Sequence, residues 1–220
     1  MMEGEFKIRV TYAMRGRLVM LSHLEVARAL ERAVRRADLP FAVTQGFSPH
    51  MKLAFGAALP VGVGGDHEIF DVTMTEYVDP DEALRRLQDA SPYDLMPESV
   101  EYITREVKAA SVAYPFGTYR AVFDGPVDGL QVPDSITVIR KKKEKQLRPA
   151  DFLVGALEKN GNEMLFTLEA KPSGSLRPDV LVNAMLDGAE DGLVNTDLGA
   201  ARSDTRLHVV SLMRIAQRAE

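Results

Sequence analysis

Two histidines and one lysine, His23, His50 and Lys52, are of types that could act on a phosphate group. His23 follows Ser22 at the expected start of a helix, where free backbone N–H groups favour an anion. His50 and Lys52 lie in the segment Phe47-Ser48-Pro49-His50-Met51-Lys52. Two imidazoles with a lysine suit general acid–base chemistry on a phosphodiester, or simple phosphate recognition. The plainer alternative is that His23 packs at a helix start and His50 decorates a turn.

Arginines recur on one face of the same expected helix. Arg28, Arg32 and Arg35 are spaced i, i+4 and i+7, and guanidinium groups bind phosphate through two parallel hydrogen bonds. The alternative is a solvated helix face, since Glu31 stands four residues before Arg35 and can pair with it. Either way these arginines are expected on the surface.

The stretch 41–65 holds the other expected binding residues. Gln45 and Gly46 form a turn. We expect a recognition edge made of His23, Gln45, His50 and Lys52, with Gly46 and Phe47 as further substrate-binding residues and the arginines of the helix holding phosphates. The glycines of 60–65 lack the spacing of a phosphate-binding loop and are interpreted as a flexible connection. Asp66, His67, Glu68 and Asp71 alternate along a strand, so their side chains point to opposite faces and we expect no metal site.

The densest charge run is 140–148, with six basic residues and one acid. A basic hairpin that grips RNA or another acidic partner is one interpretation. A solvated loop, or an edge strand protected by lysines, is the other. No aromatic residue interrupts the run, which disfavours base stacking there.

The elements that must position these residues follow the order strand, helix, strand, strand, helix, strand. Apolar and polar residues alternate from Phe6, Ser22 and Glu25 form a capping box, and Pro40 ends the helix that they begin. Asp79-Pro80 opens the second helix and Ser91-Pro92 ends it. Extended segments are expected at 41–44 and 52–55, on either side of the Gln45-Gly46 turn, and further strands at 68–77 and 95–107. This order is typical of the ferredoxin-like split βαβ fold of the α+β class.

The chain is expected to divide near residue 110, into a ferredoxin-like domain at 1–110 and a second α+β domain at 111–220. Small residues and a proline at 109–115 separate two patterned regions. The second half shows short strand candidates and one clear helix, which Arg177-Pro178-Asp179 opens. We expect it to repeat the first fold in degraded form.

Composition limits the classes of function. The chain has no Cys, which excludes disulfides, thiolate catalysis and cysteine-held iron–sulfur clusters, and favours a reducing cytoplasm. No apolar run reaches the length of a membrane span, so no membrane partner is expected. We also expect no cofactor. Residues 1–60 carry nine Lys/Arg and five Asp/Glu, whereas 61–100 carry two and ten. A polyanion would therefore meet the first segment and avoid the second.

A family resemblance follows from three motifs: 21–25 (LSHLE), 44–56 (TQGFSPHMKLAFG) and 59–62 (LPVG). With them the chain resembles the bacterial radical SAM-linked proteins, a domain found alone or joined behind a cobalamin-binding radical SAM domain. Weaker similarity continues through 139–148 and 176–178, while Ser48 and Met51 stand where the family more often has Asn and Pro. The resemblance implies a radical SAM/cobalamin-binding partner in tRNA or rRNA modification or maturation, and it assigns no catalytic residue.

Three hypotheses follow. The leading one is a cytoplasmic, cofactor-free RNA-binding accessory module that presents RNA to a separate radical SAM enzyme. The second is a metal-independent endoribonuclease that uses His23 and His50, to which the split βαβ fold adds a distant similarity to CRISPR repeat-processing endoribonucleases. The third is a protein-interaction subunit with no nucleic-acid contact.

Overall fold

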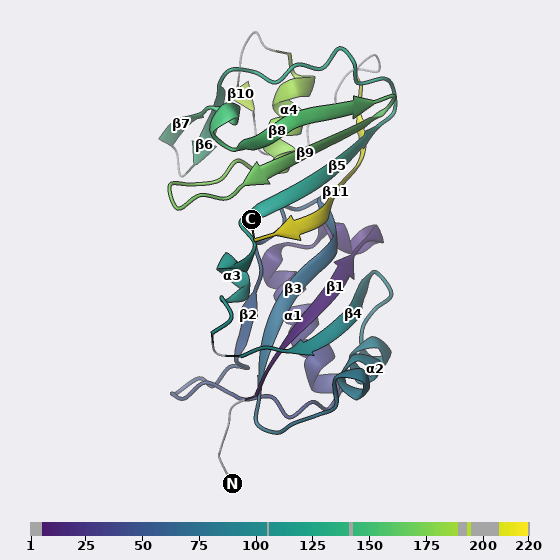
Figure 1. Cartoon of the computed structure of the whole chain (residues 1–220), viewed down its shortest axis with the longest axis vertical. Helices are drawn as coiled ribbons and strands as arrows, with labels where there is room; N and C mark the ends of the chain where they lie inside the picture. The colour runs from purple at the N-terminus through teal and green to yellow at the C-terminus, as the bar shows by residue number, and fades with distance from the viewer. Residues whose placement is uncertain (1–5, 105, 141–142, 189–192, 195–206, 220) are drawn as a thin grey trace. The chain divides into compact units, whose positions relative to one another are not determined.

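The computed structural model (Figure 1) describes residues 6–104, 106–140, 143–188, 193–194 and 207–219. It divides into two compact units, 1–114 with 218–220 and 115–217. Each unit is a mixed α+β structure, so the expected fold class is confirmed. No helix within these described ranges is long and apolar enough to cross a bilayer.

The first unit has the split βαβ order that the sequence predicts. Its elements are β1 (Phe6–Met14), the 3-10 helix η1 (Gly16–Met20), α1 (His23–Arg36), β2 (Leu53–Phe55), β3 (Gly64–Met74), α2 (Pro80–Ala90), β4 (Leu95–Tyr102) and α3 (Ala110–Ala113). The strands lie in the order β4-β1-β3-β2, and every neighbouring pair is antiparallel. This is the strand order of the ferredoxin-like arrangement.

The helices α1 and α2 cover one face of this sheet, and α1 passes behind it in Figure 1. Alternate residues of β1 point into the core, where Ile8 and Val10 are fully buried against Leu30 and Leu87 of the helices. The predicted capping box forms at the start of α1. There the Glu25 carboxylate accepts hydrogen bonds from the backbone N–H of Ser22 (2.8 Å) and from its hydroxyl (2.7 Å). These bonds lower the pKa of Glu25.

The connection between β2 and β3 is shorter than the glycines of 60–65 suggest. Gly64 and Gly65 belong to β3, and Gly65 lies opposite Met14 of β1. A Cβ atom on Gly65 would lie 2.4 Å from the Glu68 carboxylate. Gly65 thus belongs to a strand that approaches the Glu68 side chain closely, and not to a flexible loop.

The second unit repeats the strand order of the first. It contains β5 (Phe116–Phe123), β6 (Ile136–Arg140), β7 (Lys143–Leu147), η2 (Pro149–Asp151), β8 (Leu153–Asn160), β9 (Glu163–Glu169), α4 (Pro178–Leu186), β10 (Leu193–Val194) and β11 (Val209–Arg218). Its main strands lie in the order β11-β5-β9-β8. These strands take the places of β4, β1, β3 and β2, and α4 stands before the last strand as α2 does.

What differs is the element between the first and second strands. The first unit has α1 there, whereas the second has the β6–β7 hairpin and η2. The hairpin joins β10 in a small sheet of order β10-β6-β7. The repeat is therefore degraded at one helix. The hairpin carries the described part of the basic run, and Lys141 and Lys142 lie outside the described residues.

Candidate nucleic-acid interface

The arginine stripe lies on the outer face of α1. The helix buries Val26, Leu30, Ala33 and Val34 against the sheet, which leaves Arg28, Arg32 and Arg35 exposed. Arg35 pairs with Glu31, with 2.7 Å between Nη2 and Oε1, as the alternative interpretation expects. Arg28 lies near Glu25, and beside the hydrogen bonds from Ser22 its charge contributes to the lowered pKa of that carboxylate.

A hairpin over residues 41–52 carries the expected recognition edge except for His23, and Figure 1 shows it as the blue loop that leaves the sheet below β2. At its base the Ala42 N–H donates to the Thr73 carbonyl (2.7 Å) and the Lys52 N–H donates to the Ala42 carbonyl (2.9 Å). Farther out, Val43 bridges to Met51. Lys52 therefore lies at the base of the hairpin, half-buried, and not at its tip.

The tip presents an aromatic ring to solvent. Phe47 is completely exposed. Before it, Gly46 has a φ of +136°, a conformation that only glycine adopts without strain, and a Cβ atom there would meet nothing within 4 Å. Gln45 and His50 are exposed as well. The backbone N–H of His50 donates to the Thr44 hydroxyl (3.0 Å), and the Thr44 N–H donates to the His50 carbonyl (2.7 Å). These bonds hold the two arms of the hairpin together below Phe47.

The hairpin and the arginine stripe meet at one end of α1. The Arg35 guanidinium lies 5.2 Å from the centre of the Phe41 ring, within the range of a cation–π contact. Phe41 bridges to Met74 at the end of β3, so the hairpin starts beside the last turn of α1. The structure thus joins Arg35 to the base of the segment that carries Gln45, Phe47 and His50.

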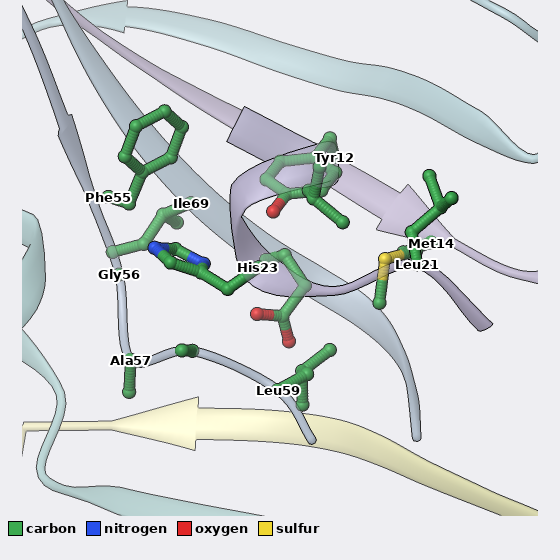
Figure 2. A pocket seen from close by; sticks show the side chains of 12 residues that line it. Tyr12, Met14, Leu21, His23, Phe55, Gly56, Ala57, Leu59 and Ile69 are labelled. Atoms are coloured by element: carbon green, nitrogen blue, oxygen red, sulfur yellow. The ribbon is translucent and has the colours of Figure 1, made fainter. Parts of the chain in front are cut away.

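His23 lies at the other end of α1, in a small pocket of its own (Figure 2). Its imidazole meets the Phe55 ring edge-to-face, with 5.5 Å between ring centres. Tyr12, Met14, Leu21, Gly56, Ala57, Leu59 and Ile69 stand around it in Figure 2, and Glu68 also lines the pocket. Its volume of ≈ 20 Å³ is room for about one water molecule.

The structure does not bring His23 and His50 together. His50 is not among the residues that line the His23 pocket. Phe55, which contacts His23, pairs with Phe70, whereas the hairpin base at Phe41 pairs with Met74. Four strand residues span about 13 Å, and His50 lies beyond that base. The described residues therefore show no pocket that the two imidazoles share, and the 14-residue α1, about 21 Å long, separates the His23 end of the helix from the end that contacts the hairpin base.

Sequence reasoning missed a buried ion pair on the other face of the sheet. Arg9 and Asp71 are 3% and 1% exposed, although their alternation with apolar residues suggested a solvated strand face. The Arg9 guanidinium also donates to the Lys108 carbonyl (3.0 Å), and the Ala110 N–H donates to Asp71 (3.3 Å). The hydrogen bond with Asp71 raises the pKa of Arg9. The signal in the sequence was one opposite charge in each of two expected strands, but the register that sets them face to face comes from the fold. The pair fastens the segment before α3 to the sheet.

Comparison with known proteins places the chain in a family. Residues 7–183 match the family described as "Uncharacterized protein conserved in bacteria (DUF2344)", and the chain belongs to it. The match covers both units for most of their length. No curated protein matches the chain.

Proposed function

We propose that this member of the bacterial DUF2344 family is a cytoplasmic RNA-binding accessory module that works with a radical SAM/cobalamin-binding enzyme in tRNA or rRNA modification or maturation. The observation that carries the RNA part is the meeting of the arginine stripe with the base of the hairpin: Arg35 contacts Phe41, where the segment that exposes Phe47 begins. The enzyme part rests on the resemblance described above.

The chemistry of this edge fits single-stranded RNA. Guanidinium groups along α1 can neutralise successive phosphates. An exposed aromatic ring can stack on an unpaired base, whatever its sequence. Gln45 and His50 beside the ring supply polar groups for base edges. Because the whole chain carries a net charge of −5, binding must be confined to such a local basic surface.

Fluorescence anisotropy of a labelled single-stranded RNA tests this proposal. Three arginine–phosphate contacts predict a slope of log K against log [salt] of about −2 for a single strand. Absence of binding at low salt, or a slope near zero, would overturn it. A DNA single strand and an RNA duplex at equal concentrations serve as competitors. The single strand should compete better, because its bases are unpaired.

Two of the original hypotheses remain as alternatives to this proposal. The endoribonuclease hypothesis needs His23 and His50 in one centre, whereas His50 does not line the His23 pocket. RNA that stays intact in EDTA after long incubation would count against this hypothesis. The exposed Phe47 and Val43 favour protein docking as a second candidate, since aromatic anchors dominate many interfaces. Capture of the radical SAM protein from nuclease-treated extract, lost in Phe47→Ala, would support docking without RNA.

A further inference from the structure

A second pocket lies within the 115–217 unit, between the small sheet and α4. Its volume is ≈ 100 Å³, several times that of the His23 pocket. Its walls come from β6, β7, the loop before α4 and α4 itself. The lining residues are Val138, Ile139, Lys145, Leu147, Gly174, Ser175, Arg177 and Val180.

One wall is apolar except for a single lysine. Val138 of β6 pairs directly with Lys145 of β7, and directly paired residues point to the same face of a sheet. That face also carries Ile136 and Leu147, which are buried with Val138. Lys145 therefore extends along an apolar surface and keeps its ammonium group at the exposed rim.

The facing wall is a tight turn that approaches this lysine. Lys171 and Gly174 exchange two backbone hydrogen bonds of 3.0 Å each. Gly174 has a φ of +143°, and a Cβ atom on it would lie 3.5 Å from the Lys145 Nζ. A side chain would find room at that distance, so the glycine is favoured here by its positive φ, and Ser175 follows at the pocket wall.

The second cation is held in a set orientation. Arg177 donates from Nε to Oδ1 of Asp179 (3.0 Å) and from Nη2 to Oδ2. Asp179 is buried at the start of α4, so the guanidinium plane is fixed by a partner that cannot move freely. A guanidinium has five N–H donors, and this pair uses two. With Asp179 neutralised by Arg177, Lys145 leaves the pocket with one net positive charge.

We infer that this pocket binds a small organic anion, with a phosphate or carboxylate group between Lys145 and Arg177 and an apolar body against Val138, Leu147 and Val180. Cationic hydrogen-bond donors recognise an oxyanion, and a mostly apolar lining with a few placed polar groups is the usual form of a small-molecule site. The inference does not depend on the proposed RNA surface, because all of its residues belong to the second unit. The competing account is that Lys145 merely protects an edge strand from pairing.

The test is to titrate small ligands into the full chain at constant ionic strength and to record ¹H–¹⁵N correlation spectra at each step. Phenyl phosphate and benzoate carry both halves of the expected ligand, inorganic phosphate carries only the anion, and benzyl alcohol carries only the apolar body. We expect the first two to shift the amide signals of 174–180 and 145–147 and to bind more tightly than either half. The inference would be overturned if none of these ligands gave a saturable shift below about 10 mM, because the affinity would then be weaker than millimolar.

Matched lysine variants separate a pocket from a generally basic hairpin. Lys143 and Lys145 lie two residues apart on β7, both exposed, and only Lys145 lines the pocket. We expect Lys145→Ala to weaken phenyl phosphate binding by about tenfold, which corresponds to about 1.4 kcal/mol, and Lys143→Ala to leave it unchanged. Equal weakening by both variants would mean that the hairpin attracts anions without a site, and would overturn the inference. The spectra also report whether each variant is folded.

Discussion

Arg9 and Asp71 lie directly opposite each other on β1 and β3, and their side chains form two hydrogen bonds inside the protein. The Nε–Oδ1 distance is 2.8 Å and the Nη2–Oδ2 distance is 3.1 Å. Because the Arg9 guanidinium is buried, it depends on the Asp71 carboxylate as its counter-charge. The polar face of β1 and β3 is therefore buried at this pair.

Removing one partner should therefore be costly. We expect Asp71→Ala to lower the free energy of unfolding by about 3–5 kcal/mol, since Arg9 would stay buried without a counter-charge. Urea unfolding followed by circular dichroism measures it. Lys7, 3.7 Å from Asp71 and one-third exposed, is the control, and Lys7→Ala should cost less than about 1 kcal/mol. A loss below 1 kcal/mol for Asp71→Ala would contradict the assigned role.

Gly16 should not tolerate a side chain. Its φ of +56° is unfavourable for other residues by about 1–2 kcal/mol, and a Cβ atom would lie 2.3 Å from the Asp94 carboxylate. We expect Gly16→Ala to destabilise by more than the backbone cost alone. In a double-mutant cycle, the penalty of Gly16→Ala should be smaller in an Asp94→Ala background, because the clash is then absent. Equal penalties in both backgrounds would mean that Asp94 moves aside freely.

The pair of Asp124 and His208 predicts a pH-dependent contribution to stability. The backbone N–H of His208 (2.7 Å) and then its imidazole (2.9 Å) lower the pKa of Asp124. A carboxyl with a lowered folded-state pKa stabilises above its ordinary value of about 3.9 and loses that contribution as the pH falls. The stability difference between wild type and Asp124→Asn should therefore shrink from pH 6 toward acid. Urea midpoints measured at several pH values give this difference, and a difference that stays constant with pH would contradict the role assigned to Asp124.

The arginine stripe predicts a graded loss of RNA binding and of salt dependence. We expect Arg32→Ala to weaken binding and to reduce the salt slope by about 0.7, the share of one phosphate on a single strand. Arg85→Ala is the matched control, since Arg85 is an exposed helix arginine that pairs with Glu82 and Asp89. Anisotropy titrations at several salt concentrations give both quantities. If the two variants lose affinity equally, the stripe has no special part in binding.

Phe47 predicts a stacking contribution that salt does not change. We expect Phe47→Ala to weaken RNA binding by about 1–3 kcal/mol with an unaltered salt slope. Tyr93, 90% exposed in the same unit, supplies the control variant Tyr93→Ala. Quenching of a fluorescent base analogue in the RNA reports stacking directly. An unchanged affinity in Phe47→Ala would assign the hairpin tip to something other than RNA.

The sequence by itself determined the local elements. Ser22 and Glu25 predict the start of α1 and Pro40 its end, because capping and the missing proline N–H act within a few residues. The same short-range rules place Arg28, Arg32 and Arg35 on one exposed face. From the order of these elements the split βαβ arrangement also follows, and the strand order of the first unit confirms it.

Only the tertiary structure decided which residues lie together. Strand register sets Arg9 against Asp71, 62 residues apart, and α3 covers what alternation alone marks as a solvated face. The fold also sets His23 against Phe55 in a pocket that His50 does not line. Long-range packing also sets the β6–β7 hairpin against α4, and residues of both line one pocket. Periodicity shows which side of an element is apolar, but the partner across the sheet is chosen by long-range packing.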